Sequence, residues 1–171
     1  MLTLQAITME LLVFCLGLIL LLAKLVTKKD AKVPYNEITI VGLVIAGVMG
    51  WFFKPELSVV FGGMYYTDNY SLFFKELIVV CAILICLASR EFVERKGLNE
   101  PEYYMLISFA TLGMMNIASA GDLVTLFVGI ELMTMSFIVL IGFDRHNALA
   151  TEAGLKYLVL SALSTAVMLY G

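Results

Sequence analysis

The most constraining feature of the sequence is the apolar stretch from Asp122 to Phe143, which carries Glu131 near its centre. A helix rises about 1.5 Å per residue, so Glu131 would lie roughly 13 Å from one end of this stretch and 18 Å from the other. Those distances place it near the middle of a hydrocarbon core about 30 Å thick. A carboxylate at that depth costs on the order of 3 kcal/mol to insert, so Glu131 requires a partner, a water-filled cavity or a proton.

The composition of the whole chain supports a membrane environment. Of its 171 residues 61% are hydrophobic and 15% are charged, and the mean hydropathy is +0.97. A soluble domain is usually about half apolar and a quarter charged. The net charge of −3 indicates no nucleic-acid partner, and the three cysteines all fall within apolar runs, where reduced core residues are expected.

Six apolar runs are each long enough to cross a bilayer. They are Leu4–Leu25, Glu37–Phe53, Tyr70–Ala88, Glu102–Ala120, Asp122–Phe143 and Ala148–Gly171. No cleavage site follows the first run, so it is expected to be a retained helix. The sequence therefore predicts an all-α, polytopic membrane protein of about six transmembrane helices, with an irregular stretch at 55–70 and a charged connector at 89–101.

The basic residues predict an orientation for these helices. If the first connector is cytoplasmic, the segments 24–36, 89–101 and 144–147 face the cytoplasm and both ends of the chain face outward. The inner segments then hold eight basic residues and the outer segments two, with Lys156 left inside a helix. This asymmetry fits the positive-inside rule, and the predicted location is the bacterial plasma membrane.

Glu131 is the first candidate for a functional site. Its neighbours one turn away on a helix are apolar except for Thr134, so its own helix offers no charged partner. A functional interpretation makes it a carboxylate that takes up and releases a proton. The structural alternative is a neutral carboxyl that is hydrogen-bonded to a neighbouring helix.

Lys156 is the second candidate, because it lies about 12 Å along the last predicted helix. It could modulate the protonation of Glu131 or carry a proton itself, with Ser161 and Ser164 as polar neighbours. The alternative is a local ion pair with Glu152, which precedes it in the favourable i,i+4 order.

Other charged residues in the apolar runs are expected to lie at the ends of their helices without a part in proton transfer. Glu10 should reach water from the start of its helix, Glu76 should lie at the bilayer interface, and Lys75 should point away from Glu76. His146 is expected at the surface of a loop. The sequence contains no phosphate-binding loop, metal-ligand cluster or nucleophile–base pair.

Three segments resemble the antiporter-like membrane subunits of bacterial proton-pumping NADH:quinone oxidoreductase, respiratory complex I. They are 102–115, 118–133 and 151–158. Their sequences most resemble the subunit N family, whose mitochondrial counterpart is NADH dehydrogenase subunit 2. The resemblance is densest from Glu102 to Gly171. It implies a fold of about fourteen helices that contains two inverted five-helix repeats, of which 1–101 supplies three N-terminal helices and 102–171 the first three helices of an incomplete first repeat.

The resemblance also implies roles for individual residues. Glu131 matches the family's essential glutamate, and Lys156 matches a lysine found at the same point of the following helix. Further lysines of the family would lie beyond Gly171. Because no polar segment closes the sequence, we expect the chain to be part of a longer protein.

The function implied by this resemblance is proton translocation coupled to quinone reduction, as a subunit of a redox enzyme complex. No redox cofactor is expected in this chain; quinone, NADH, FMN and iron–sulfur clusters are expected elsewhere in the complex. The expected partners are the other membrane subunits and the lipid bilayer. A subunit of a multi-subunit sodium/proton antiporter is the first alternative, and a structural or assembly module without ion transport is the second.

Overall fold

The computed structural model describes residues 6–26, 33–52 and 58–171. Within them the chain forms six helices longer than a single turn. They are α2 (Thr8–Val26), α3 (Tyr35–Phe52), α4 (Asn69–Lys96), α5 (Glu100–Ala118), α6 (Leu123–Ile141) and α7 (Ala148–Tyr170). The prediction of an all-α, multi-pass membrane protein is confirmed, since five of these helices are long and apolar enough to cross a bilayer.

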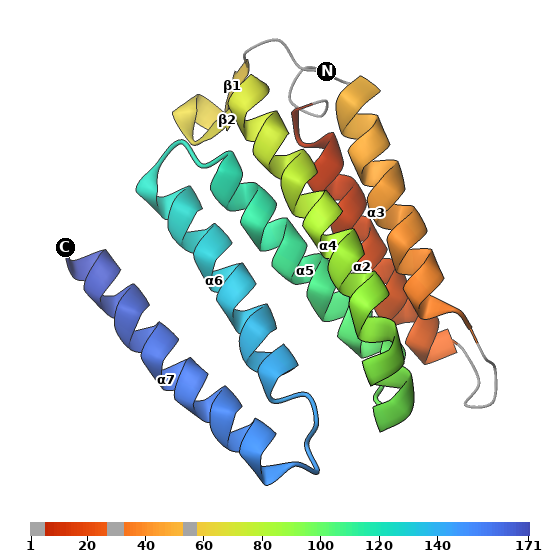
Figure 1. The fold of residues 1–171 in the computed structure, drawn as a ribbon. Helices are drawn as coiled ribbons and strands as arrows, with labels where there is room; N and C mark the ends of the chain where they lie inside the picture. The colour runs from red at the N-terminus through yellow and green to blue at the C-terminus, as the bar shows by residue number, and fades with distance from the viewer. Residues whose placement is uncertain (1–5, 27–32, 53–57) are drawn as a thin grey trace.

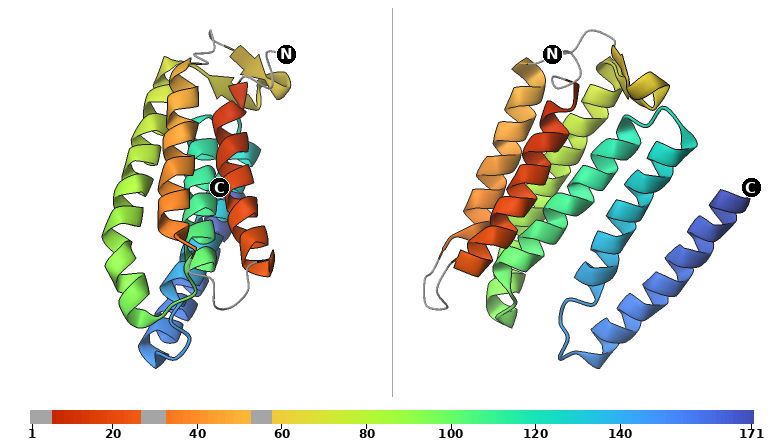
Figure 2. Two further views of the ribbon diagram at one scale, coloured as in Figure 1. Left: turned by 90° about the vertical axis from the view of Figure 1, so that its right-hand side faces the viewer. Right: turned by 180° about the vertical axis from the view of Figure 1, so that it is seen from behind.

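The helix outside that set of five is α5, which occupies the centre of the bundle. It packs against α2, α4 and α6, and the right-hand view of Figure 2 shows it running between α2 and α6. Ten of its 19 residues are buried. Because protein rather than lipid covers α5, its surface can be less apolar, and its internal hydroxyls are satisfied locally: Ser108 and Thr111 donate to the carbonyls of Tyr104 and Ile107 at 3.0 and 2.8 Å.

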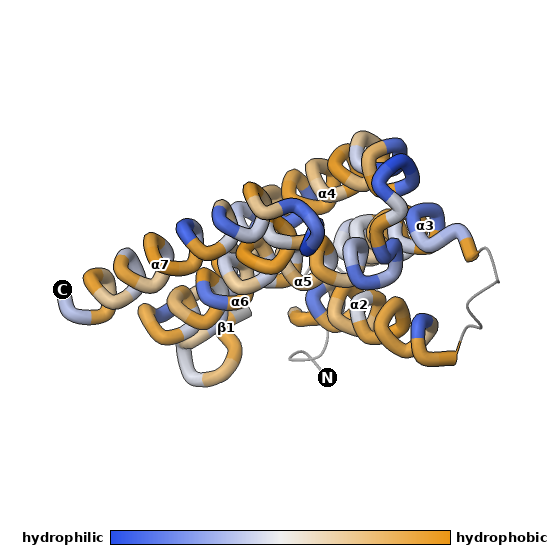
Figure 3. The backbone as a smooth tube through the Cα atoms, turned by 90° about the horizontal axis from the view of Figure 1, so that it is seen from below, coloured by the Kyte–Doolittle hydropathy of each residue, from blue (hydrophilic) through white to orange (hydrophobic). Residues whose placement is uncertain are grey.

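Successive helices run in opposite directions. The C-terminal ends of α2, α4 and α6 therefore gather at one end of the bundle, and their N-terminal ends gather at the other (Figure 1). Figure 3 is viewed from the first of these ends and shows hydrophilic positions concentrated there, with apolar positions along the helices. Residues that begin α2, α4 and α6 can thus meet although they are distant in sequence.

Helix α4 is longer than the sequence predicted. It continues through the expected connector at 89–101 to Lys96, where Gly97 ends it with a left-handed backbone conformation (φ 59°). Two pairs one turn apart support the extension: Arg90 pairs with Glu94 at 3.1 Å, and Arg95 pairs with Glu91. Such i,i+4 pairs stabilise a charged helix segment in water, so the high local charge does not prevent helix formation.

The irregular stretch predicted at 55–70 contains a small hairpin. Strand β1 (Ser58–Val60) pairs antiparallel with β2 (Tyr65–Thr67) around the 3-10 turn Phe61–Gly63. The turn requires positive φ angles, which glycine adopts without steric cost, at Gly62 (68°) and Gly63 (103°). This part of the prediction was wrong because apolar spans dominate the hydropathy pattern and strands this short leave little signal.

The hairpin is fixed to the link between α5 and α6. The Tyr66 amide donates to the Ser119 carbonyl at 2.9 Å, and the Gly121 amide donates to the Met64 carbonyl at 2.8 Å. A Cβ on Gly121 would lie 2.2 Å from the Gly63 carbonyl oxygen, so only glycine permits this approach. The hairpin consequently closes one end of the bundle over the starts of α2 and α4.

Candidate functional site

Glu131 lies in the middle of α6 and faces a groove between α6 and α7. Helix α6 begins at Asp122, whose carboxylate accepts a hydrogen bond from the Thr125 amide at 2.8 Å. Hydrogen bonding from Thr125 lowers the pKa of Asp122 below its usual value, so the helix start carries a stable negative charge. Glu131 itself is half-buried, and the groove that it lines has a volume of about 280 Å³.

Two of the predicted supporting residues share this groove with Glu131. Thr134 and Ser161 both line it, together with Thr165, which the sequence had not singled out as a site residue. The Thr134 hydroxyl donates to the Glu131 carbonyl at 3.1 Å, and the Ser161 hydroxyl donates to the Leu158 carbonyl at 3.1 Å. These hydroxyls keep free acceptor lone pairs, so they can bind water or a protonated carboxyl in the groove.

No ion pair among the described residues includes Glu131. Lys156 pairs instead with Glu152 on its own helix, at 2.6 Å between Nζ and Oε1, with 70% and 58% of the two side chains exposed. Ser164 donates to the Leu160 carbonyl and does not line the groove. The structure therefore brings Glu131, Thr134 and Ser161 together, and it leaves Lys156, Glu152 and Ser164 outside the groove.

The position of α7 explains this separation. Its one buried residue is Gly154, where a Cβ would lie 3.3 Å from the Cα of Gly142 at the end of α6. Beyond this contact α7 diverges from α6 toward the C-terminus (Figure 1). The two helices are thus joined closely at one end and enclose the open groove farther along, beside Glu131.

A second ionisable cluster is buried at the other end of the bundle, where the hairpin meets α2 and α4. Lys75 of α4 lies 2.6 Å from the Glu10 carboxylate of α2 and donates to the Tyr65 hydroxyl of β2 at 3.0 Å. The Tyr65 hydroxyl also donates to Glu10. The residues are only 1% (Lys75), 6% (Glu10) and 6% (Tyr65) exposed, so each depends on the other two for its polar contacts.

The electrostatics of this Glu10–Tyr65–Lys75 cluster follow from its burial. Burial, and then the charge of Glu10, raise the pKa of Tyr65 above its usual range, so the phenol stays neutral and can donate. One carboxylate oxygen, Glu10 Oε2, is buried without a hydrogen bond to any described residue. A buried acceptor without a partner is costly, which makes the cluster dependent on the positive charge of Lys75.

This cluster was not predicted from the sequence. The expectation that Glu10 reaches water was wrong, because Glu10 is 6% exposed and contacts Lys75 and Tyr65. A signal was present: α2 and α4 run in the same direction, and Glu10 and Lys75 lie near the same end of these helices. An acid and a base in separate apolar runs at matching depth could have been paired on that basis.

Glu76 lies between α3 and α4, apart from both the Glu131 groove and the Glu10–Tyr65–Lys75 cluster. Its Oε1 atom is buried without a hydrogen bond to any described residue, and the glycines of α3 make room for the carboxylate. A Cβ on Gly50 would lie 3.0 Å from Oε1, and one on Gly47 would lie 3.1 Å from Oε2. In the part of the chain that the structure describes, no group of three metal-binding side chains is assembled.

The fold and the Glu131 groove define a class: a multi-pass membrane protein whose helix bundle holds ionisable groups at membrane depth. Comparison with known proteins shows which family of membrane proteins this chain resembles. Residues 120–171, which contain α6 and α7, match the family model described as NADH:quinone oxidoreductase/Mrp antiporter, transmembrane.

Proteins of known name are similar in sequence to nearly the whole of this chain. NADH-quinone oxidoreductase subunit N from Desulforamulus reducens is 39% identical over 168 residues, which are 96% of this chain and 35% of that protein. The subunit N of Moorella thermoacetica is 41% identical over 173 residues, 100% of this chain and 36% of its own length. The resemblance seen in the sequence is confirmed: this chain is similar to subunit N, and it spans about a third of the length of the relatives it matches.

A solved structure supports the fold independently. Respiratory complex I from Thermus thermophilus with bound Aureothin contains a chain that superposes with a TM-score of 0.76 at 24% identity. The match covers 95% of this chain and 35% of the other. The arrangement of helices α2 to α7 is therefore shared with a chain of that complex.

Proposed function

We propose that this chain forms part of a proton-translocating membrane subunit of an NADH:quinone oxidoreductase, in which Glu131 takes up and releases a proton. The observation that carries the proposal is the environment of Glu131: a half-buried carboxylate in the middle of an apolar helix, facing a groove with Thr134 and Ser161. The names of the relatives support the complex to which the subunit belongs.

The roles of the residues follow from their chemistry. A carboxylate at membrane depth that has no ion pair can exchange a proton with water or with a cation that reaches it. Thr134 and Ser161 can hold water in the groove beside it. Lys156 would act as the modulating cation only after leaving Glu152, and a lysine that is 70% exposed and weakly held by an i,i+4 pair is free to do so.

The proposal extends to topology, organisation and partners. The end of the bundle at which α2, α4 and α6 terminate would face the cytoplasm, which the excess of basic residues there supports. Residues 1–101 would form the N-terminal helices, and 102–171 the first helices of the first antiporter-like repeat. The other membrane subunits would be the partners, with quinone, NADH, FMN and iron–sulfur clusters held elsewhere in the complex.

The test is the change Glu131→Gln in the complete subunit within the assembled complex. Gln keeps the size and hydrogen-bonding capacity of the side chain but cannot exchange a proton. Proton pumping, measured by quenching of a pH-sensitive dye in membrane vesicles that oxidise NADH, should fall several-fold. The exposed carboxylate of Glu91 offers a matched control, and Glu91→Gln should pump normally. Normal pumping by Glu131→Gln in a fully assembled complex would exclude the relay role.

A second candidate is a subunit of a sodium/proton antiporter, because the description of the matching family model names both kinds of protein. The two functions differ in their energy source. Transport driven by NADH oxidation and independent of added Na⁺ supports the first, and transport driven by a Na⁺ gradient without NADH supports the second. If neither activity changes in Glu131→Gln, the six helices act as an assembly module.

A further inference from the structure

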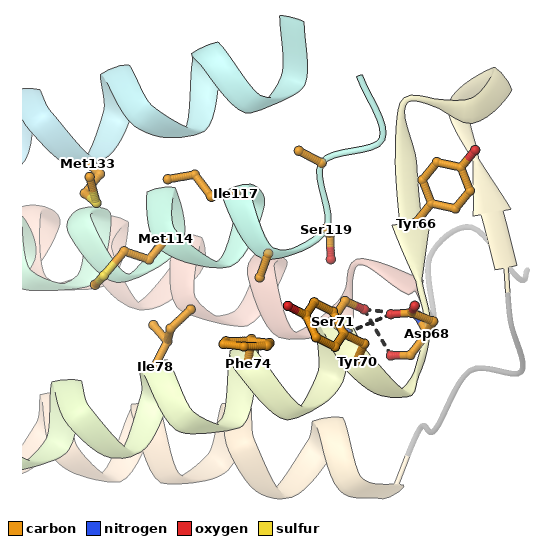
Figure 4. A pocket seen from close by; sticks show the side chains of 12 residues that line it. Tyr66, Asp68, Tyr70, Ser71, Phe74, Ile78, Met114, Ile117, Ser119 and Met133 are labelled. Carbon is orange, nitrogen blue, oxygen red and sulfur yellow. Dashed lines mark hydrogen bonds between the residues drawn. The ribbon is translucent and has the colours of Figure 1, made fainter. Parts of the chain in front are cut away.

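A second hollow lies away from Glu131, where α4, α5 and α6 meet strand β2 (Figure 4). Its volume is about 640 Å³, within the range of pockets that hold small organic ligands. Its inner part is apolar and is lined by Phe74, Ile78, Met114, Ile117 and Met133. Its mouth lies at the start of α4, the end of the bundle that carries the hairpin, and is polar. A pocket with one polar and one apolar part suits an amphipathic molecule.

The charge at the mouth is negative. Asp68 caps α4: its Oδ1 atom accepts from the Ser71 amide at 2.7 Å, and the Ser71 hydroxyl accepts from the Asp68 amide at 3.0 Å. The cap uses only one of the two carboxylate oxygens. Among the described residues that line the pocket there is no lysine, arginine or histidine, and the buried cation of α4, Lys75, already pairs with Glu10. The mouth therefore favours a cationic group.

Aromatic rings stand beside this carboxylate. Tyr70 and Phe74, one turn apart on α4, have ring centroids 4.7 Å apart and lie close to Asp68 (Figure 4), and Tyr66 of β2 also lines the pocket. The faces of aromatic rings attract ammonium groups, and more strongly when water is excluded. A carboxylate together with aromatic rings is thus a combination suited to an amine.

Ser119 adds a buried polar group to the same pocket. It is 2% exposed and points into the hollow (Figure 4). Its hydroxyl makes no hydrogen bond of good geometry to a described residue. A buried hydroxyl of this kind usually has a partner. An oxygen-bearing ligand such as an ester could supply one.

We propose that this pocket binds one phosphatidylethanolamine molecule from the surrounding bilayer. The ammonium group donates to Asp68 against the rings of Tyr70 and Phe74, and an acyl chain runs along Ile78, Met114 and Met133. Phosphatidylglycerol lacks the cation, and the quaternary ammonium of phosphatidylcholine has no N–H to donate to the carboxylate. The proposal is independent of proton transport by Glu131.

The test measures lipid retention by the complete subunit, purified in detergent, using native mass spectrometry. The subunit is titrated with phosphatidylethanolamine, phosphatidylglycerol and phosphatidylcholine that have identical acyl chains. One phosphatidylethanolamine should be retained about tenfold more tightly than phosphatidylglycerol, a difference of about 1.4 kcal/mol, because only its headgroup can donate a charged hydrogen bond to Asp68. Equal retention of the three lipids would overturn the proposal.

Two pairs of variants locate the site. Asp68→Asn removes the charge but keeps a good helix cap, so the preference for phosphatidylethanolamine should disappear while thermal unfolding stays unchanged. Asp144→Asn, at the opposite end of the bundle, should keep the preference. Tyr70→Leu should weaken binding several-fold and Tyr70→Phe should not, because Phe retains the aromatic face. An unchanged preference in Asp68→Asn, or equal effects of the two Tyr70 variants, would show that the lipid binds elsewhere.

Discussion

The chain contains two glutamate–lysine pairs with opposite character. Glu10 and Lys75 come from different helices, are 8% and 2% exposed at their side chains, and share Tyr65. Glu152 and Lys156 come from one helix, are 58% and 70% exposed, and lie the same 2.6 Å apart. The two pairs therefore have the same length but different surroundings. Glu10 and Lys75 are buried, so a lost partner is not replaced by solvent. Glu152 and Lys156 are exposed, so solvent can replace either partner.

The same contrast distinguishes the two halves of the bundle. Helices α2 to α5 surround a shared core, with the hairpin over one end, whereas α7 contacts the rest of the described chain mainly through α6. The buried ionisable groups of the first half, Glu10, Tyr65 and Lys75, come from three elements. Lys156 in the second half is exposed and Glu131 makes no ion pair with a described residue, which is the arrangement that the proposed proton relay requires.

The largest expected effect comes from removing the buried cation. Lys75→Met leaves Glu10 charged and buried without a counter-charge, which should lower the free energy of unfolding by about 3–5 kcal/mol. Chemical unfolding of the chain in detergent, followed by circular dichroism, measures this value. Lys156→Met is the matched control and should change stability by less than about 0.5 kcal/mol. Equal losses in the two variants would remove the distinction between the pairs.

The next effect concerns the junction of the two halves, where α5 crosses α6. A Cβ on Gly113 would lie 2.7 Å from the Met133 amide nitrogen and 2.8 Å from the Gly129 carbonyl oxygen, both backbone atoms. Gly113→Ala must therefore push the helices apart, at a cost of about 1–3 kcal/mol in unfolding free energy.

Gly142→Ala is the control for that change, because the contacts of its Cβ begin at an ordinary 3.6 Å. The midpoint of unfolding should shift for Gly113→Ala and stay within error for Gly142→Ala. Tolerance of alanine at position 113 would mean that α6 is not held tightly against α5.

A smaller loss is expected when the bridging phenol is removed. Tyr65→Phe keeps the ring over Lys75, whose Nζ lies 5.0 Å from the ring centroid, and deletes the hydroxyl that contacts both charges. The cost should be about 1–2 kcal/mol, below that of Lys75→Met, because the ion pair itself remains. Unfolding in the same detergent tests the order, and a loss larger than that of Lys75→Met would make the phenol rather than the ion pair the main stabilising group.

The smallest effect is expected in the exposed pair. Glu152→Gln should change the free energy of unfolding by less than about 0.5 kcal/mol, because water already solvates both partners. A loss above about 1 kcal/mol would instead indicate that the pair anchors α7, and Lys156 could not then be described as free to leave it.

Much of this architecture was predictable from local sequence. The apolar runs located the six helices, and the run that was drawn from Asp122 begins at the residue that caps α6. Glu131 and Thr134 were predictable as neighbours because residues one turn apart share a helix face, whereas the position of Ser161 in the same groove depends on how α7 packs against α6. The extension of α4 to Lys96 was missed because exposed i,i+4 charge pairs resemble a polar connector in a hydropathy pattern.

Sequence alone determined the class of the protein, the helices that compose it and the depth of Glu131, because length, apolarity and helical rise are local properties. Tertiary structure decided which charges have partners. The pairing of Glu10 with Lys75 depends on two helices that start at the same end and on a hairpin that excludes water, and the isolation of Glu131 depends on the divergence of α7 from α6. Contacts between helices arise from packing, and no periodicity within one helix encodes them.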